Sequence, residues 1–323
     1  MSKKAEVLSA AYIRPVFDTI TRLGLPTERH LALNGLGKFR IYDNDAMLPK
    51  SLAFEFFDYM YRREGDELIS EIMRNYSLLQ VPVWGDATLS RPDIFSALRF
   101  AAATAPIISS ESRLDIGFSG KTVIVTHTFG DGMFESELKW GSVWTLPLAI
   151  EIMRLACGPE WRPYRIDLTD DSTKIYDGVF DFAGVDIRLA QPNMRLHFGT
   201  LDLSKRLSVS RSKLDLPQMA YSQADRVFRL LDALGPGSSP TLIFVATSLN
   251  LSPRTLERLL AAEGQTFSSV LKSWRLERAF ALLNQPDMGV AEVAARLHYS
   301  NSSHLGRAFR SWTGKTPLEY RDA

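Results

Sequence analysis

The feature that most constrains the fold of this 323-residue chain is a short segment that occurs twice near its C-terminal end. Residues 245–252 (VATSLNLS) align with residues 293–300 (VAARLHYS) at an offset of 48, with Val, Ala, Leu and Ser in common. With one inserted residue, residues 256–258 then align with residues 305–307. Each copy has a short helical segment, a polar turn that ends at serine, and a second helical segment. The sequence therefore predicts two helix-turn-helix motifs in one chain.

The two copies also predict which residues form the core of each motif. A small residue at Ala246 and at Ala294 allows two helices to cross closely. The leucines expected to fill the shared core are Leu249, Leu256, Leu297 and Leu305. Ser252 is a natural N-cap, because its hydroxyl can accept a hydrogen bond from a free backbone N–H, and Pro253 fits the first helical position. The second helix of the first copy is thus predicted to begin at Pro253.

The second helix of such a motif lies in the DNA major groove, and residues near its N-terminus contact base edges. Arginine pairs bidentately with guanine and glutamate accepts from the cytosine amino group, so the first copy is expected to give more direct base readout. The second copy is expected to contribute more phosphate and shape contacts. A merely solvated helix face is the alternative for Arg254 and Arg258. The predicted DNA-binding residues are Ser252, Arg254, Thr255, Glu257, Arg258, Asn301, Ser302, Ser303, His304, Arg307 and Arg310.

A helix without Gly or Pro is predicted between the two motifs, over residues 267–284. At about 1.5 Å per residue it forms a rod of roughly 25 Å. Such a rod can hold two recognition helices about one DNA turn apart, roughly 34 Å, on one face of the duplex. A single chain is then able to read two successive major grooves.

The rest of the chain predicts a different fold. Apolar spacing indicates helices in residues 1–75, with Gly65 interrupting one that begins after Pro49. Alternation predicts a hairpin over 113–129 and strands at 164–168, 185–189 and 194–198. A helix is predicted from Trp144 to Cys157, with Pro147 in its first turn. We therefore expect a multidomain chain in which an α+β N-terminal domain precedes an all-α C-terminal domain, with its two helix-turn-helix motifs joined by a long helix.

The expected domain limits follow from these patterns and from a polar segment between them. The N-terminal domain spans 1–203, a linker spans 204–216, and the C-terminal domain spans 217–323 with Pro217 as the first residue of its first helix. The linker contains Lys205, Arg206, Arg211 and Lys213 among serines. It is expected to be solvated, with phosphate contact as the alternative.

Composition is compatible with a folded protein of about two domains, with 45% hydrophobic and 23% charged residues. No run approaches the ~18 consecutive apolar residues of a membrane span, and no apolar stretch follows the opening Met-Ser-Lys-Lys, so we expect a cytoplasmic protein without membrane contact. The formal net charge of +1 divides unevenly, because residues 237–323 hold 10 basic and 7 acidic residues while 1–236 hold 28 and 30. Near-neutrality of the whole chain therefore does not exclude DNA as a partner.

Catalysis, metal binding and cofactors are not expected. The sequence lacks a nucleophile elbow, a His-Glu-x-x-His motif, a phosphate loop and a dinucleotide fingerprint. The five histidines have no ligand spacing: His30, His127, His197, His298 and His304. The single cysteine, Cys157, is expected to be a small core residue rather than a redox sensor. Core packing is also expected of Trp84, Trp140, Trp144 and Trp161, with the lining of an effector pocket as the alternative.

The C-terminal motifs resemble those of AraC/XylS-type transcriptional regulators. The resemblance covers residues 217–323 in order and is carried by residues 255–260 (TLERLL), 264–267 (GQTF), 275–276 (RL), 294–300 (AARLHYS), 307–314 (RAFRSWTG) and 316–321 (TPLEYR). Two positions depart from the family pattern: His298 replaces a common Gly in the turn, and Leu305 replaces a common Phe. His298 is therefore expected to affect the turn that positions the second recognition helix.

A weaker resemblance extends into the N-terminal part. Residues 23–25 (LGL), 158–163 (GPEWRP) and 182–185 (FAGV) are similar to the branch whose N-terminal domain is called arabinose-binding-like, which includes regulators of ornithine use and of virulence. The name does not establish a sugar ligand, and the sequence lacks the continuous run of short strands of a cupin-type sugar pocket.

The resemblance implies a bacterial, homodimeric activator that binds double-stranded promoter DNA and contacts RNA polymerase. Its N-terminal domain is expected to sense a small-molecule effector. In the alternative, the N-terminal domain binds no ligand and only dimerises or binds a protein partner, with the exposed face of residues 144–157 as the contact. An enzyme with an appended DNA-binding domain is the third and least favoured class.

Overall fold

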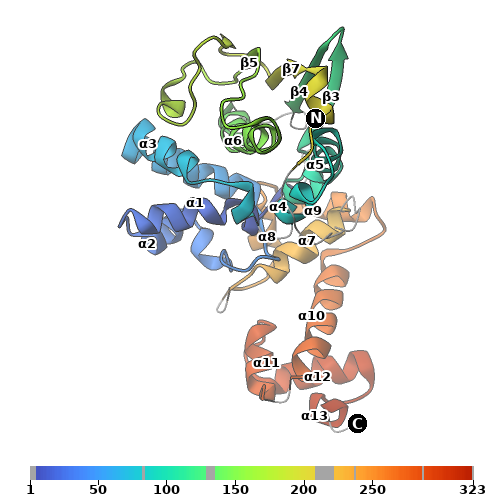
Figure 1. Cartoon of the computed structure of the whole chain (residues 1–323). Helices are drawn as coiled ribbons and strands as arrows, with labels where there is room; N and C mark the ends of the chain where they lie inside the picture. Colours follow the sequence, from blue (N-terminus) through green and yellow to red (C-terminus); the bar gives the residue numbers. More distant parts are fainter. Residues whose placement is uncertain are drawn as a thin grey trace.

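The computed structural model of the chain describes residues 5–81, 84–128, 135–207, 222–235, 238–285 and 287–321. These residues form an α+β domain followed by a region in which every regular element is a helix (Figure 1). The α+β domain contains β1 (Val7–Ser9), α1 (Ala10–Arg22), α2 (Thr27–Leu33), β2 (Met47–Pro49), α3 (Lys50–Arg74), α4 (Trp84–Leu89), α5 (Ile94–Ile108), β3 (Arg113–Ser119), β4 (Thr122–Thr128), α6 (Glu135–Cys157), β5 (Arg165–Asp167), β6 (Asp186–Arg188) and β7 (Met194–Gly199). Short 3₁₀ helices lie at Leu36–Lys38, Leu78–Gln80, Lys174–Tyr176 and Thr200–Ser204.

The α+β domain is built on a five-stranded sheet with the strand order β3-β4-β7-β5-β6. Neighbouring strands are antiparallel except for the parallel pair β5 and β6. The hairpin that the sequence predicts is β3 and β4, with Ser119 paired to Thr122. Alternate residues of β4 are buried, as expected for a sheet with one covered face. Those buried positions are Val123, Val125 and His127.

Helix α6 packs against α3 and lies next to the sheet (Figure 1). Its side chains Trp140 and Trp144 are completely buried, and their rings stack with centroids 6.1 Å apart. The helix begins at Glu135, so Pro147 lies inside it and the prediction of a start near Trp144 is wrong. Burial of Trp140, whose Nε1 donates to Asp58 at 2.6 Å, stabilises the added turns despite the proline. Trp140 and Trp144 are core residues, as expected, whereas Trp161 is half-buried and the side chain of Trp84 lies outside the described part.

Two further features shape the first helices of this domain. The short strands β1 and β2, which the sequence did not predict, pair antiparallel with Val7 opposite Pro49 and hold the N-terminal segment against the start of α3. Within α3, Gly65 has non-helical backbone angles (φ 78°, ψ −166°), which confirms the predicted interruption. No helix among the described residues is long and apolar enough to span a membrane.

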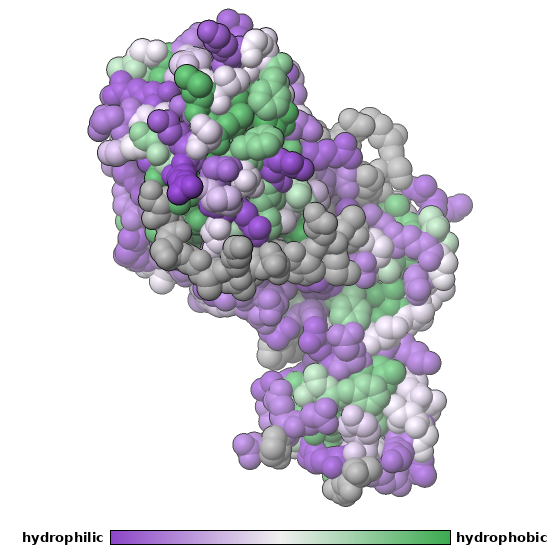
Figure 2. Space-filling view, turned by 45° about the vertical axis from the view of Figure 1, so that its right-hand side comes forward, coloured by the Kyte–Doolittle hydropathy of each residue, from purple (hydrophilic) through white to green (hydrophobic). Residues whose placement is uncertain are grey.

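The helical region contains α7 (Gln223–Asp232), α8 (Leu242–Ser248), α9 (Pro253–Ala261), α10 (Phe267–Leu283), α11 (Val290–Arg296), α12 (Ser302–Thr313) and α13 (Pro317–Arg321). Helices α7, α8 and α9 lie against the α+β domain, and α10 leads away from it to α11, α12 and α13 (Figure 1). In Figure 2 the C-terminal end of the chain forms a smaller lobe below the main body. Most of the predicted linker, and the predicted helix start at Pro217, lie outside the described residues.

Candidate nucleic-acid interface and N-terminal cavity

The two predicted helix-turn-helix motifs are α8 with α9 and α11 with α12, and their turns have the same backbone geometry. Asn250 and His298 occupy equivalent positions and both have left-handed conformations, with φ of 53° and 58°. In both turns the residue after this left-handed position donates its backbone N–H to the carbonyl oxygen of the alanine in the first helix. Leu251 donates to Ala246 at 2.8 Å, and Tyr299 donates to Ala294 at 2.9 Å. The sequence repeat is thus a structural repeat.

The predicted core and caps of both motifs are present. Both alanines and all four predicted core leucines are buried. Ser252 accepts a hydrogen bond from the backbone N–H of Thr255 at 3.1 Å, which caps α9. Asn301 accepts from the N–H of His304 at 2.9 Å, which caps α12. These side chains satisfy backbone donors that a helix start leaves open and so define where each recognition helix begins.

The departures from the family pattern do not disturb this arrangement. His298 adopts the left-handed angle that a glycine would take, and its ring stacks on Trp274 with centroids 5.8 Å apart. Leu305 is completely buried. The expectation that His298 changes the turn is therefore wrong, because the turn matches that of the first copy and the imidazole instead packs on Trp274 of α10.

The predicted DNA-binding residues lie on the outer faces of α9 and α12. All of them are exposed except Thr255, which is half-buried. Within the described part of the chain, Arg254 and Arg307 form no ion pair with an acidic side chain, so their guanidinium groups are open to a ligand. Helix α10 separates the two motifs, and its 17 residues correspond to roughly 25 Å. The structure thus presents two capped, exposed recognition helices at the two ends of one rigid helix (Figure 1).

Helix α10 is held along its side by Asp232 at the end of α7. The carboxylate of Asp232 accepts from Trp274 Nε1 at 2.7 Å and from Arg278 Nε at 2.6 Å, both on α10. The backbone carbonyl of the same residue accepts from the guanidinium of Arg40 in the α+β domain. Next to it, Phe39 stacks on Phe244 of α8 at 6.2 Å. The first motif and the rod are therefore both held against the N-terminal domain.

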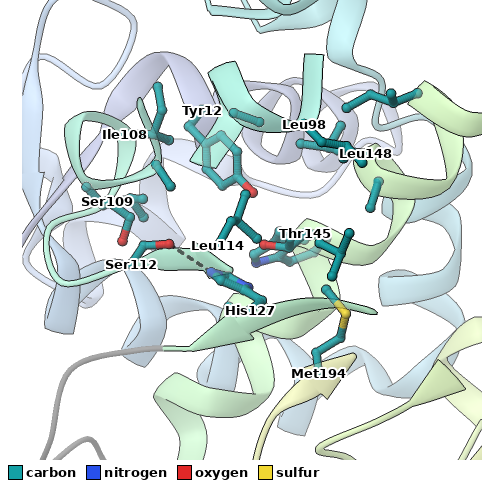
Figure 3. Close-up of a pocket in the computed structure, with 18 of the residues that line it drawn as sticks. Tyr12, Leu98, Ile108, Ser109, Ser112, Leu114, His127, Thr145, Leu148 and Met194 are labelled. Carbon is teal, nitrogen blue, oxygen red and sulfur yellow. Dashed lines mark hydrogen bonds between the residues drawn. The ribbon is translucent and has the colours of Figure 1, made fainter. Parts of the chain in front are cut away.

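The N-terminal domain contains a largely apolar cavity between the sheet and helices α1, α5 and α6 (Figure 3). It measures about 60 Å³, several times the ~10–15 Å³ that one water requires. Leu98, Ile108, Leu114, Leu148 and Met194 supply much of the apolar wall. Figure 3 shows Tyr12 reaching in from α1 on one side and His127 from β4 on the other.

A few polar groups line this cavity. Ser112 Oγ and His127 Nε2 are 2.8 Å apart and hydrogen-bonded. Burial and the charge of Lys50 lower the pKa of His127 to about 3, so the imidazole is neutral at physiological pH. Ser109 and Trp144 also face the cavity, and among the described residues Ser109 Oγ and Trp144 Nε1 are buried atoms without a hydrogen-bond partner.

The loop that forms one edge of the cavity also contacts α7. Between Ser109 and Ser112, Glu111 has a left-handed backbone angle (φ 66°) and pairs with Arg226 of α7 at 3.1 Å. Both side chains are about nine-tenths buried, and Arg226 also donates to the backbone carbonyl of Ala5 at 3.2 Å. The neighbouring Ser110 bonds to β1, through its hydroxyl to the N–H of Val7 at 2.7 Å. The cavity wall is thus joined to a helix that packs directly on α10.

Comparison with known proteins gives the class of the C-terminal domain. Residues 245–323 match the family model described as a helix-turn-helix domain. Over 98 residues the chain is 42% identical to the ornithine utilization regulator of Pseudomonas aeruginosa, covering 30% of this chain and 29% of that protein. It is 37% identical over 98 residues to the HTH-type transcriptional regulator VirS of Mycobacterium tuberculosis, with the same coverage of 30% and 29%. The matches therefore span less than a third of these curated relatives.

The C-terminal part of the chain is a DNA-binding helix-turn-helix domain. Residues 245–323 are thus similar to the helix-turn-helix domains of transcriptional regulators, in the region where the sequence motifs predicted such a domain. The structure of the transcriptional regulator CdpR from Pseudomonas aeruginosa aligns over 97% of this chain and 98% of that one, with a TM-score of 0.46 and 20% sequence identity.

Sequence reasoning found the nucleic-acid interface but not the cavity. The cavity lining comes from β1, α1, α3, α5, α6 and three strands of the sheet, and no local pattern brings these segments together. The sequence did contain one indication of the cavity. In β4 every second residue is buried, and His127 takes the next buried position after Val123 and Val125, so a polar ring faces the core. The half-buried Cys157 fits the predicted packing role, because burial raises the pKa of its thiol. Among the described residues, no group of acidic, His or Cys side chains is arranged to hold a metal ion.

Proposed function

We propose that this protein is a sequence-specific transcriptional regulator that places α9 and α12 in two successive major grooves of one DNA face. The observation that carries the proposal is the duplicated motif, with matching turns and capped, exposed recognition helices at the two ends of α10. In the first motif Arg254, Glu257 and Arg258 read base edges. In the second motif Asn301 and Arg307 are the strongest candidates, and Ser302, Ser303, His304 and Arg310 contact phosphates.

The experiment that tests this proposal is selection of bound duplexes from a random library by the full chain. The selected sites should contain two preferred blocks with centres about 10 base pairs apart. Changing both Arg254 and Arg258 to Ala should remove the preference in one block and weaken binding by roughly 1–3 kcal/mol per lost base contact. Lys272→Ala, an exposed cation of α10 outside both recognition helices, is the matched control. Selected sites without any sequence preference would rule out base readout by these helices.

We further propose that a small-molecule effector in the N-terminal cavity controls DNA binding. Support comes from the cavity itself and from the Glu111–Arg226 pair, which joins the cavity wall to α7. A ligand that moves the Ser109–Ser112 loop alters the contacts of α7, and α7 holds the rod through Asp232. Glu111→Gln should then reduce the effect of a ligand on DNA affinity while leaving ligand binding in place. Asp115→Asn, an exposed carboxylate on β3, should leave the coupling unchanged.

The alternative, in which the N-terminal domain only dimerises or binds a protein, has less support. It placed the contact on the exposed face of residues 144–157, but every residue of α6 from Lys139 to Cys157 is buried or half-buried within the chain. Other parts of the function rest on the family resemblance alone: activation, contact with RNA polymerase, a homodimer and a cytoplasmic location. Light scattering of the full chain with and without its selected duplex tests the dimer directly.

A further inference from the structure

We propose that the N-terminal cavity binds an uncharged, mostly apolar small molecule that carries a hydrogen-bond acceptor such as a carbonyl or hydroxyl oxygen. This inference rests on the proposed effector control and adds to it the chemical class of the ligand. Three observations carry it: the absence of charge in the lining, the unpartnered buried donors, and the enclosed apolar volume.

The lining offers no partner for an ionised ligand. None of the described residues that line the cavity is an Asp, Glu, Lys or Arg. The imidazole of His127 is neutral and already hydrogen-bonded to Ser112, and burial raises the pKa of the Tyr12 phenol, so that ring is neutral as well. The cation whose charge reaches His127 is Lys50, and its ammonium group is completely buried and paired with Glu6. A carboxylate or ammonium in the cavity would lose its hydration without gaining a counter-charge, which is strongly unfavourable.

The polar atoms define what the ligand must offer. Trp144 is 1% exposed and Ser109 is 7% exposed, and among the described residues Trp144 Nε1 and Ser109 Oγ lack a partner. Leaving a buried polar atom unpaired is costly, so such atoms in a native structure call for an explanation. An indole N–H only donates, and therefore a ligand that pairs with Trp144 must accept. A bound acceptor oxygen satisfies the indole and explains why a tryptophan nitrogen is kept in an apolar wall.

The remaining surface limits how polar the ligand can be. Aliphatic side chains and the ring of Tyr12 form the rest of the wall, and the Tyr12 hydroxyl already bonds to Thr145. A sugar or an amino acid presents several donors and acceptors or two charges, and most of them would have no partner here. A compact ring or short branched chain with one oxygen fits these constraints.

Two pairs of probes that share one ring test the ligand class on the full chain. Acetophenone and benzyl alcohol are the neutral probes, and benzoate and benzylamine are their charged counterparts at pH 7.5. We expect the neutral probes to raise the melting temperature by several degrees when present at about 100 times their Kd. The charged probes should bind at least tenfold more weakly in calorimetric titration.

Variants on α6 and α5 locate the binding. Trp144→Phe keeps an aromatic ring, although a smaller one, and removes the donor, so it should weaken acetophenone binding roughly fivefold or more. Ala105→Leu, on the α5 wall of the cavity, should fill the space and abolish binding. The matched controls are Trp140→Phe, whose Nε1 bonds to Asp58 outside the cavity, and Ser142→Ala, a buried hydroxyl of α6 that does not line it. Both controls should bind the neutral probes as the wild type does.

The outcomes separate this inference from the proposed function. Equal or tighter binding of benzoate or benzylamine would overturn the ligand class and leave effector control standing. Binding that survives both Ala105→Leu and Trp144→Phe in folded protein would overturn the site. Failure of both neutral probes at millimolar concentration would overturn the proposal that this cavity accepts such molecules. Specific DNA binding by the ligand-free chain is measured separately, so its loss would count against the regulator and not against the cavity.

Discussion

His127 occupies a position that β4 otherwise gives to valine. Its ring lies on the buried face of the sheet at 4% exposure, with Nε2 hydrogen-bonded to Ser112. Burial and the charge of Lys50 lower its pKa to about 3, against 6.5 for an ordinary histidine. Because the folded state holds this ring neutral, the unfolded chain binds one more proton at every pH between these two values.

The stability of the protein should therefore fall as the pH drops below 6.5. One extra proton on the unfolded chain corresponds to about 1.4 kcal/mol per pH unit, and hence to about 2 kcal/mol between pH 6.5 and pH 5. Urea unfolding at pH 7 and pH 5 measures this loss, and His127→Gln should reduce it by that amount. His304→Gln, which removes an exposed histidine, is the matched control. An unchanged slope in His127→Gln would show that the ring is not held neutral.

His298 should show the cost of its left-handed backbone. Both His298→Ala and His298→Gly remove the ring that stacks on Trp274, but only glycine adopts a φ of 58° without strain. We expect the Gly variant to be more stable than the Ala variant by about 1 kcal/mol in chemical denaturation. The same order should hold for Asn250→Gly and Asn250→Ala in the first turn. An Ala variant as stable as the Gly variant would mean that the turn relaxes to another conformation.

At the residue scale the sequence was most informative where it repeats. The repeat aligns Ser252 with Ser300, and the cap of the second recognition helix is instead the next residue, Asn301. The outer faces of both helices were still predicted, because the buried leucines fix their orientation. The role of His127 was not predictable, since it depends on Ser112, Lys50 and helices that lie far away in the sequence.

At the scale of elements, α10 connects the two helix-turn-helix motifs, and its start is well defined. Thr266 accepts from the N–H of Ser269, and the Ser269 hydroxyl accepts from the N–H of Thr266, which forms a capping box. The middle of the helix carries Trp274 and Arg278, which bond to Asp232 of α7. The orientation of the second motif therefore depends on the cap at the N-terminal end of α10 and on the bonds between α10 and Asp232.

Removal of this cap should destabilise the helical region. Thr266→Ala should cost about 1 kcal/mol in denaturant unfolding, because the backbone N–H of Ser269 loses its side-chain acceptor. Ser268→Ala lies two residues further on, is exposed, and should change stability by no more than about 0.5 kcal/mol. Equal effects of the two substitutions would show that the cap contributes nothing to stability.

Elements with strong local periodicity were predicted, whereas those set by tertiary contacts were not. The α10 helix and the β3–β4 hairpin agree with the prediction to within a few residues. The strands β1 and β2 have three residues each and exist because they pair with one another. The strand order of the sheet could not be predicted from the local sequence pattern either, because β7 lies between β4 and β5. The early start of α6 reflects burial of Trp140 that no local signal indicates.

At the scale of the whole molecule, DNA affinity should depend on salt through a small number of cations. The C-terminal 87 residues hold 10 basic and 7 acidic residues, so binding requires that particular arginines face the phosphates. For the full chain, the logarithm of the binding constant should fall linearly with the logarithm of salt concentration. Arg310→Ala should reduce the slope by roughly 0.9, because this arginine is proposed to contact a phosphate. Lys121→Ala, in the β3–β4 turn, should leave it unchanged, and salt-independent binding would contradict the account.

Helix α7 belongs by its contacts to both domains. Arg226 on one side bonds to Glu111 and Ala5, and Asp232 at its end bonds to α10. The predicted boundary at 217 assigns this helix to the DNA-binding domain, and that boundary stays a prediction.

The double contact of α7 limits how such chains can diverge. If recombination exchanged either domain, α7 would have to pack against a foreign domain whose residues do not match its side chains. Substitutions at Arg226 or Asp232 affect contacts with both domains, because Arg226 pairs with Glu111 of the N-terminal domain and Asp232 bonds to α10. We therefore expect relatives to keep an N-terminal domain together with its own DNA-binding domain.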